Sequence, residues 1–392
     1  MMKIRIIRCF STRVIVDKWF KALQSPTHNE QQSELGQCIE YTLQQDPTIH
    51  YNLIKDIIHR WTIEQPKTNA LWTNQINNNE SQKLTFNDIN IQSSHFASIL
   101  TGNEFNLTPG KSVLVYLPYS SKERILIELA CLQSDLVFCS YDLKYLSEND
   151  IRQQIRTLAV DCIITNVDHL DMIMHCTYNS LRPLKKGLIN HSSISKPLPI
   201  GWHSLMHNIN NNGLRIGSIQ SPKGCLRHLT NDRPIDQYSQ SRFAIMQLLT
   251  AYWLNMNKPP SLIWIKNTHN KISLAPWLLG STIFHKETDN IETILKTFEN
   301  YPIDTFCASQ SNYQMLDKQQ QQQLQNNIQL KQLFSVEPIV DPIIKTRWHS
   351  LTNLHIQDDF PDSNNKSDTK SYLTSFKYKQ LENTHETNQH RT

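Results

Sequence analysis

The chain has 392 residues, which is enough for two or more packed subdomains, and its formal net charge at pH 7 is +4. The basic residues are spread along the chain rather than clustered, so the charge pattern excludes a nucleic-acid-binding surface of the usual basic kind. No apolar run reaches the roughly 18 residues that a membrane-spanning helix needs, and the 9 glycines fall well below the about 7% of an average protein.

The first 16 residues predict a mitochondrial transit peptide. Their basic residues lie at positions 3, 5, 8 and 13 with apolar residues between them, and the first acidic residue is Asp17. An arginine-rich, acid-poor and amphipathic start is typical of import into the mitochondrial matrix. The alternative interpretation is a first strand or helix of the fold with basic flanks. Residues 17–47 are interpreted as a polar leader that precedes the folded part.

Residues 113–165 predict a unit of alternating strands and helices. The apolar runs at 113–117, 136–140 and 161–165 each have the length of a buried strand, and the first run is followed by Pro118, which cannot donate to a central ladder. A polar helix at 151–158 separates the last two runs. Strands joined by helices favour parallel pairing with a right-handed crossover, so the predicted fold class is α/β.

The helix between the first two apolar runs has a recognisable start and a recognisable face. Ser120 or Ser121 can cap its N-terminus, because a serine oxygen accepts a hydrogen bond from a free backbone N–H of the first turn. Ile125, Leu129 and Leu132 repeat every three or four residues and therefore share one face of the helix.

The cysteines and histidines predict no disulfide and no metal site. The eight cysteines form no CxxC pair, and several lie in apolar segments, which is typical of reduced, buried thiols. His203 and His207 are spaced to present two imidazoles to a metal, but no HExxH motif surrounds them and no carboxylate is near in the sequence. The low-complexity run Gln319–Gln323 is interpreted as a solvated loop or helix extension.

Several separated segments carry a family resemblance. They are YNLIKDIIHRWTIEQPKTNALW at 51–72, KLTFNDINIQSSHFASIL at 83–100, the strand–helix–strand unit at 114–143, Gly-Trp at 201–202, and 274–316 with an apolar helix, a strand and a Tyr-Pro-Ile turn. In order and spacing these segments resemble the medium-chain acyl-CoA synthetases of the adenylate-forming (AMP-binding) acyl-CoA ligase superfamily. In that family the Gly-Trp pair starts a helix.

The resemblance covers residues 48–360 and implies the large N-terminal domain of the family, built from two stacked α/β subdomains. The family continues with a ribose-binding aspartate, a hinge and a small C-terminal domain with a catalytic lysine. We expect this small domain to be missing, because residues 361–392 are polar and are interpreted as a disordered tail.

The family reaction, as the resemblance implies, has two steps. ATP and a medium-chain fatty acid form an acyl-adenylate and pyrophosphate, and the thiol of coenzyme A then displaces AMP. The first step needs hydrogen-bond donors around the phosphates and Mg²⁺ to offset their charge. The implied cofactors are therefore ATP, Mg²⁺ and CoA.

Residues 215–224 align without gaps with the phosphate loop of that family, Thr-Ser-Gly-Thr-Thr-Gly-x-Pro-Lys-Gly. The residues that we assign to a phosphate-loop remnant are Gly217, Ser218, Ser221, Lys223 and Gly224. Ile216 and Ile219 replace two hydroxyl residues, and Gln220 replaces a glycine that is free to adopt a positive φ. Taken alone, Ser-Pro-Lys-Gly is ordinary turn chemistry. The resemblance implies descent from the phosphate loop, and the substitutions predict weak or absent ATP binding.

The family segment that lines the adenine pocket is altered in the same way. It reads Gly-Glu-Pro in the family and Val336-Glu337-Pro338 here, so Glu337 and Pro338 are an adenine-pocket remnant and the side chain of Val336 adds bulk beside the purine. Asp341 matches an acidic residue that often follows this segment, and we assign it no role.

The family motif Tyr-Gly-x-Thr-Glu, whose hydroxyl and carboxylate serve ATP and Mg²⁺, is expected near Ile356. The chain has neither the glycine nor the Thr-Glu pair there. Asp358, Asp359 and Asp362 follow instead, and they are interpreted either as oxygen ligands for Mg²⁺ or, preferably, as a solvated acidic turn.

Three hypotheses on function remain open. The first is a divergent medium-chain fatty-acid–CoA ligase family member of impaired activity that retains an apolar acyl pocket. The second is a pseudoenzyme that associates with a full-length acyl-CoA ligase, and the third is a truncated gene product without a function of its own. We assign no catalytic residue and no metal ligand, and we expect neither a nucleic-acid partner nor a membrane span.

Overall fold

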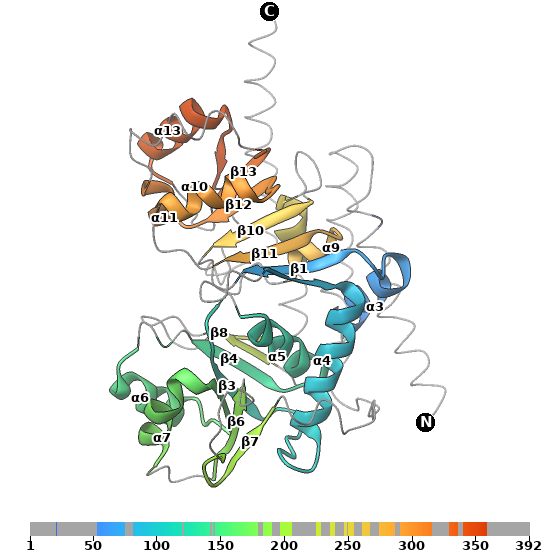
Figure 1. Cartoon of the computed structure of the whole chain (residues 1–392), viewed down its shortest axis with the longest axis vertical. Coiled ribbons are helices and arrows are strands. Elements are labelled where there is room, and N and C mark those ends of the chain that lie inside the picture. Colours follow the sequence, from blue (N-terminus) through green and yellow to red (C-terminus); the bar gives the residue numbers. More distant parts are fainter. Residues whose placement is uncertain are drawn as a thin grey trace, which may run out of the picture.

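The computed structural model contains two β-sheets that lie one above the other in Figure 1, with helices between them and on their outer faces. The residues it describes are Lys21, 53–74, 81–119, 121–141, 143, 146–178, 183–189, 197–205, 225–228, 236–239, 247–248, 250–254, 261–266, 274–286, 291–315, 329–335 and 340–358. This arrangement confirms the predicted α/β class.

The lower sheet in Figure 1 contains the three predicted strands. Its members are β3 (Ser112–Tyr116), β4 (Val137–Tyr141), β5 (Cys162–Asn166), β6 (Lys185–Ile189), β7 (Trp202–Ser204), β8 (Cys225–His228) and β9 (Asp236–Ser239). Their order is β7-β6-β5-β3-β4-β8-β9, and all neighbours run parallel except β8 and β9. The bounds of β3, β4 and β5 lie within one residue of the predicted runs, and their parallel pairing is confirmed.

The upper sheet combines an early segment of the chain with later ones. Its members are β1 (Asn69–Asn74), β2 (Ser81–Thr85), β10 (Leu262–Lys266), β11 (Thr282–Lys286), β12 (Thr305–Ala308), β13 (Gln332–Ser335) and β14 (Ile356–Gln357). Their order is β14-β13-β12-β10-β11-β1-β2, and only β1 and β2 pair antiparallel.

The helices form three layers around the sheets (Figure 1). The central layer holds α3 (Leu53–Glu64), α4 (Phe86–Thr101), α5 (Lys122–Gln133) and α9 (Ala275–Leu278). The outer face of the lower sheet carries α6 (Glu148–Thr157), the 3-10 turn η2 (Val167–His169) and α7 (Leu170–Thr177). The outer face of the upper sheet carries α10 (Ile291–Asn300), α11 (Gln310–Gln314) and α13 (Pro342–Thr352).

Each layer has its own hydrophobic core, and the central core joins the two sheets. It contains Val115 of β3 and Phe138 of β4 from the lower sheet, together with Leu71 of β1, Ile283 of β11 and Phe334 of β13 from the upper sheet. Separate cores lie against the outer face of each sheet. Burial of apolar surface at about 25 cal/mol per Å² makes this shared core the main attraction between the sheets.

Helix α5 differs from its prediction in how much of it is buried. Ser121 caps the helix as expected, because its Oγ accepts a hydrogen bond from Arg124 N at 3.3 Å. Ile125 and its helical neighbours are buried, but so are Glu123, Arg124 and Glu128 on the rest of the helix surface. The reason is that α5 lies between the two sheets, whereas the sequence pattern reports only one buried face.

The expectation of a helix that starts at Gly201-Trp202 is wrong. Residues Trp202–Ser204 form β7, which pairs with β6 in the register Lys186↔Trp202 to Leu188↔Ser204. Gly201 has φ +81, so it makes the turn that leads the chain into this edge strand.

The described cysteines are buried free thiols, as predicted. They are Cys131, Cys139, Cys162, Cys176 and Cys307. Burial raises the pKa of the Cys162 and Cys307 thiols, which keeps them in the unreactive protonated form. In the part of the chain that the structure describes, no helix is long and apolar enough to cross a membrane.

The fold determines the surroundings of His203. A carboxylate distant in the sequence lies near it in the fold, because Glu104 Oε2 is 3.8 Å from His203 Nδ1, and the Phe105 ring lies beside the imidazole. His207 lies outside the described residues. Among the described side chains, no group of three or more His, Cys, Asp or Glu residues is placed to hold a metal.

Candidate ligand site at the carboxyl edges of the sheets

The topology of the upper sheet indicates where a ligand would bind. In open α/β sheets, ligands bind outside the carboxyl ends of the strands, at the point where successive connections turn to opposite sides. The chain passes from β10 to its neighbour β11 and then crosses back to β12 on the other side of β10. The switch point therefore lies between β10 and β12, whose last residues, Lys266 and Ala308, are register partners.

The lower sheet presents its own carboxyl edge to the same junction. Helix α5 follows the carboxyl end of β3, and Arg124 in its first turn contacts Ser140 near the end of β4. Arg124 also acts electrostatically on His285, near the end of β11 in the upper sheet. The start of α5 thus lies at the carboxyl edge of the lower sheet and within electrostatic range of His285 near the end of β11.

Arg124 is the best-defined polar side chain at this junction. It is only 4% exposed. Its Nε and Nη2 donate to Ser140 Oγ at 3.2 and 3.1 Å, and its guanidinium lies 4.8 Å from the centre of the Tyr119 ring. Nη2 is 3.9 Å from Glu128 Oε2, which is an ion-pair distance but longer than a hydrogen bond. These contacts fix the orientation of the guanidinium.

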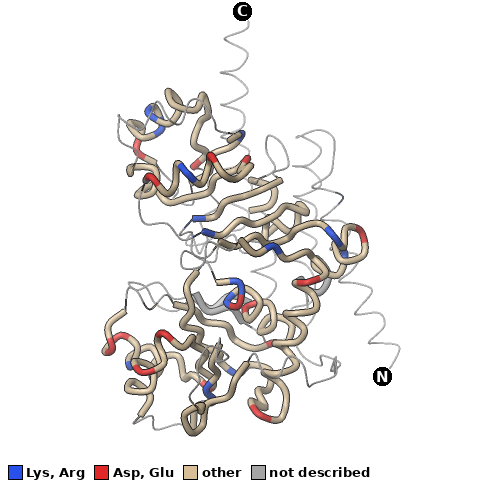
Figure 2. The backbone as a smooth tube through the Cα atoms, in the orientation of Figure 1, with Lys and Arg blue, Asp and Glu red and all other residues tan. Residues whose placement is uncertain are grey.

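Basic residues end the neighbouring strands of the upper sheet. Lys266 is buried at the end of β10, and Lys286 lies at the end of β11, where burial lowers the pKa of its ammonium group. Figure 2 shows basic segments at the ends of both strands and, below them, mixed charges at the start of α5. Burial and the nearby Arg124 lower the pKa of His285 to about 3, so its imidazole is neutral at physiological pH.

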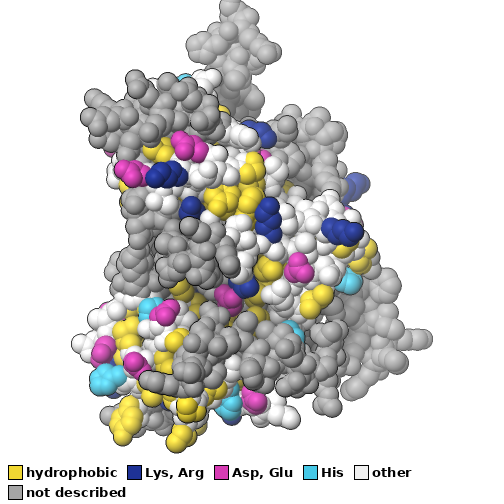
Figure 3. Space-filling model, in the orientation of Figure 1, with side chains coloured by type: hydrophobic (Ala, Val, Ile, Leu, Met, Phe, Trp, Pro, Cys, Tyr) yellow, Lys and Arg dark blue, Asp and Glu magenta, His cyan; other side chains and the backbone are white. Residues whose placement is uncertain are grey.

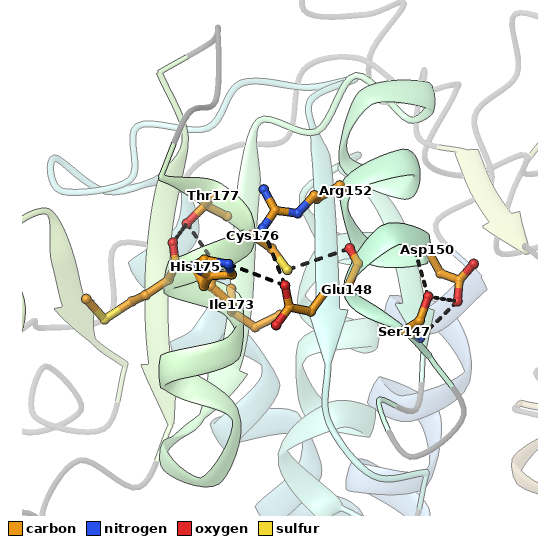
Figure 4. Close-up of polar contacts among 9 residues, drawn as sticks. Ser147, Glu148, Asp150, Arg152, Ile173, His175, Cys176 and Thr177 are labelled. Atoms are coloured by element: carbon orange, nitrogen blue, oxygen red, sulfur yellow. Dashed lines mark hydrogen bonds and ion pairs between the residues drawn. The ribbon is translucent and has the colours of Figure 1, made fainter.

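A second polar cluster joins α6 to α7 on the outer face of the lower sheet (Figure 4). Glu148 Oε2 is 3.4 Å from both Arg152 Nη2 and His175 Nε2, and Cys176 Sγ donates to the Glu148 carbonyl oxygen at 3.7 Å. The side chains of Glu148, Arg152 and His175 are all about a third or more exposed, and exposed ion pairs contribute little to stability. We interpret this cluster as a packing contact between the two helices.

The residues predicted from the family motifs are not all within the described part of the chain. The phosphate-loop remnant at 215–224 and the adenine-pocket remnant Glu337 and Pro338 lie outside it, as do Asp359 and Asp362. Asp341, which had no assigned role, is the N-cap of α13, and its Oδ1 accepts a hydrogen bond from Ile343 N at 2.8 Å.

The burial of Asp358 contradicts its interpretation as part of a solvated turn. Asp358 is buried at 8% exposure, so it is not part of a solvated turn. Its Oδ2 lies 2.6 Å from Lys345 Nζ and accepts a hydrogen bond from Val340 N at 2.7 Å. A carboxylate oxygen that already binds a lysine and a backbone N–H is poorly suited to Mg²⁺, so these contacts do not favour Asp358 as a ligand for this metal.

Substitution of Asp358 tests this assignment. We expect Asp358→Asn to lower the free energy of unfolding by about 1–2 kcal/mol, mainly through the weaker bond to Val340 N, because the pair with partly exposed Lys345 is screened by solvent. Asp341→Asn is the matched control, since asparagine caps helices as well as aspartate does. Urea unfolding measures the difference. A melting temperature that rises with Mg²⁺ in the wild type but not in Asp358→Asn would restore the metal-ligand interpretation.

The amino-acid sequence is similar to those of curated acyl-coenzyme A synthetases, in agreement with the resemblance noted above. The chain is 24% identical over 339 residues to acyl-coenzyme A synthetase ACSM3 of Homo sapiens, and 26% identical over 331 residues to acyl-coenzyme A synthetase ACSM4 of Rattus norvegicus. Each match covers 79% of this chain. The chain is homologous to acyl-coenzyme A synthetases. No protein-family model matches the chain.

Two solved structures that share this fold are an acyl-CoA synthetase and an acid ligase. An acyl-CoA synthetase of Brucella canis superimposes with a TM-score of 0.66 at 14% identity, over 82% of this chain and 60% of that chain. Coronafacic acid ligase of Pectobacterium brasiliense superimposes with a TM-score of 0.63 at 15% identity, over 77% of this chain and 59% of that chain. The fold expected from the resemblance is confirmed.

The homology covers only part of the related proteins. The chain spans 55% of the length of both curated relatives named above.

Proposed function

We propose that the chain is a divergent medium-chain acyl-CoA synthetase that still binds an apolar acid but no longer forms the acyl-adenylate. The observation that carries this proposal is the substitution of the phosphate loop within an otherwise related chain. Ile216, Ile219 and Gln220 stand where the family has two hydroxyl residues and a glycine. Without these donors, the developing charge on the phosphates is not stabilised.

The acyl-binding part of the proposal is supported by the described packing. Leu274, Ala275, Trp277 and Leu278 remain apolar and buried in the central core, in the segment from Ile272 to Leu279 that we expect to wall the acyl group. Each buried CH₂ contributes about 0.8 kcal/mol, so a medium-length chain gains enough to bind without any reaction. ATP, Mg²⁺ and CoA would supply the family chemistry, and Asp358 does not favour the metal.

A turnover assay with octanoate tests the loss of adenylation. Octanoate, ATP, Mg²⁺ and CoA are incubated with the purified chain, and pyrophosphate and octanoyl-CoA are measured beside a full-length relative. We expect no turnover above background in this chain, together with an octanoate-dependent rise in its melting temperature. A rate of about 1 per second or more that disappears in Lys223→Ala would contradict the proposal.

We further propose that residues 1–16 direct the chain to the mitochondrial matrix. The relatives named above are described as mitochondrial, and the start of this chain is basic and acid-poor. A fluorescent reporter fused to residues 1–30 should accumulate in mitochondria, and changing Arg5, Arg8 and Arg13 to glutamate should release it to the cytosol. A cytosolic reporter in both cases would rule out this targeting role.

The alternative is a pseudoenzyme that associates with a full-length acyl-CoA ligase. One observation favours it: Tyr178 and Ile200 are the most exposed large hydrophobic residues that the structure describes. Figure 3 shows hydrophobic side chains at the surface in the lower part of this view. Exposed apolar surface often marks an interaction site. Co-purification of the two chains, lost in the Tyr178→Ser, Ile200→Ser double variant, would select this alternative.

A further inference from the structure

An exposed turn joins α4 to β3 and has no role in the proposed function. Residues 108–111 are all exposed, whereas Leu107 before them is 6% exposed and Ser112 after them is 5% exposed. The turn lies at the amino end of β3, so it is on the opposite edge of the lower sheet from the candidate ligand site. Any chemistry of this turn is therefore separate from the chemistry of that site.

The backbone of the turn is defined by its proline and its glycine. Lys111 N donates to the Thr108 carbonyl oxygen at 3.1 Å, and Gly110 has φ +85, which is the pattern of a type II turn with Pro109 at its second position. Gly110 N donates to the Asp135 carbonyl oxygen at 2.8 Å. A Cβ built on Gly110 would meet no described atom within 4 Å beyond its chain neighbours. The turn is thus well formed and open to the approach of another macromolecule.

The side chain of Lys111 is held weakly. Its Nζ is 2.9 Å from Asp161 Oδ1, and the side chains of Lys111 and Asp161 are 50% and 30% exposed. Ion pairs with this exposure contribute little to stability, because solvent screens them. Asp161 keeps a second contact when the lysine leaves, since its Oδ2 accepts a hydrogen bond from Ser112 N at 2.9 Å. Lys111 can therefore turn to another carboxylate without loosening the start of β3.

The order of residues in the turn is the one that a class of modifying enzymes recognises. Proline-directed protein kinases act on Ser or Thr followed by Pro, and a basic residue three positions after the hydroxyl residue strengthens recognition. Proline has no N–H, so it fits a pocket in which the N–H of another residue would be buried without an acceptor. The chain contains three such pairs, which begin at Ser25, Thr108 and Ser221, and Lys or Arg stands at the third position after Thr108 alone.

We propose that Thr108 is a phosphorylation site for a proline-directed protein kinase. The γ-phosphoryl group of ATP would pass to Thr108 Oγ1: the Oγ1–P bond forms, the bond from the γ-phosphorus to ADP breaks, and the hydroxyl proton passes to the catalytic carboxylate of the kinase. The product carries a charge of about −1.5 to −2 at pH 7, in the same turn as Lys111. A precursor that carries the proposed targeting segment would meet such a kinase before import. The competing interpretation is that the turn only connects α4 to β3.

A kinase reaction on the folded chain separates these interpretations. The purified full chain is incubated with a cyclin-dependent kinase, ATP and Mg²⁺, and the modified residue is identified by mass spectrometry. We expect phosphate on Thr108 of the wild type and loss of this modification in Thr108→Ala. Pro109→Ala and Lys111→Ala should each lower the kcat/KM of the kinase for Thr108 at least about tenfold, through a lost pocket contact and a lost ion pair respectively.

Three controls complete the test. Lys111→Arg should keep most of the rate, because it retains the positive charge. Thr101→Ala in the last turn of α4 removes another exposed hydroxyl, one that no proline follows, and should leave the modification unchanged. A synthetic peptide of residues 104–114 reports recognition of the sequence without the fold.

Each outcome supports or overturns the proposal. Phosphate on Thr108 of the folded chain that depends on Pro109 and Lys111 supports it. Modification of the peptide but not of the folded chain overturns it, because the turn would then be closed to the enzyme. No modification of either also overturns it, as does phosphate on Ser25 or Ser221 in place of Thr108. Equal rates in the wild type, Pro109→Ala and Lys111→Ala would overturn the assigned recognition.

Discussion

Restoring three residues of the phosphate loop is expected to raise the affinity of the chain for ATP at least a hundredfold. The variant combines Ile216→Ser, Ile219→Thr and Gln220→Gly, which returns two hydroxyl groups and a glycine to the segment that ends in Pro-Lys-Gly. A hydrogen bond to a charged group contributes about 1.5–3 kcal/mol, so two regained bonds correspond to roughly 3–6 kcal/mol, or a factor of more than about 100 in Kd. Calorimetric titration with ATP in the presence of Mg²⁺ measures the change.

A matched control separates hydroxyl chemistry from loop shape. The control combines Ile216→Ala, Ile219→Val and Gln220→Gly, so it has the glycine and similar side-chain volumes but no added hydroxyl groups. We expect this control to gain less than about tenfold, because the glycine alone frees the backbone without supplying side-chain donors. Equal affinities of the two variants would show that the lost hydroxyl groups do not explain weak ATP binding.

Trp277→Ala is expected to lower the free energy of unfolding by about 3–5 kcal/mol, the range found for buried aromatic residues. Trp277 is 1% exposed, and its Nε1 donates to the Ala70 carbonyl oxygen at 2.9 Å, which ties α9 to β1. The indole of Trp61 in α3 donates in turn to the Trp277 carbonyl oxygen. These bonds join segments more than 200 residues apart in the chain.

Trp277→Phe is the control for this prediction. It keeps much of the ring volume but loses the bond to Ala70, so we expect a loss of about 1–3 kcal/mol. Urea unfolding followed by circular dichroism gives both values. A loss below 1 kcal/mol in Trp277→Ala would mean that α9 does not hold the early strand β1 in the upper sheet.

The strands of the lower sheet could be predicted from the sequence because their signal is local. β3, β4 and β5 are continuous apolar runs, and Ser121 stands where a helix cap is expected. The residues around 201–205 could not be predicted correctly, because their strand depends on pairing with β6, which is not visible in that segment alone. The full burial of α5 likewise depends on a second sheet that is formed by residues on both sides of it in the sequence.

The site residues that the resemblance predicts lie outside the described part of the chain and stay predictions, and the residues at the sheet junction were not predicted from the sequence. The junction brings Arg124 near His285, which is about 160 positions later, and no periodicity or motif connects them. Asp358 was misinterpreted because its partners, Lys345 and Val340, approach it only when β14 pairs with β13.

The most direct test of the proposed loss of adenylation is a calorimetric titration of the wild-type chain with ATP and Mg²⁺, beside a full-length relative under the same conditions. We predict that the Kd of this chain for ATP is larger than about 1 mM. This value corresponds to a binding free energy of less than about 4 kcal/mol in magnitude. Micromolar binding that depends on Mg²⁺ and is lost in Lys223→Ala would contradict it, because the altered loop would then still hold the phosphates.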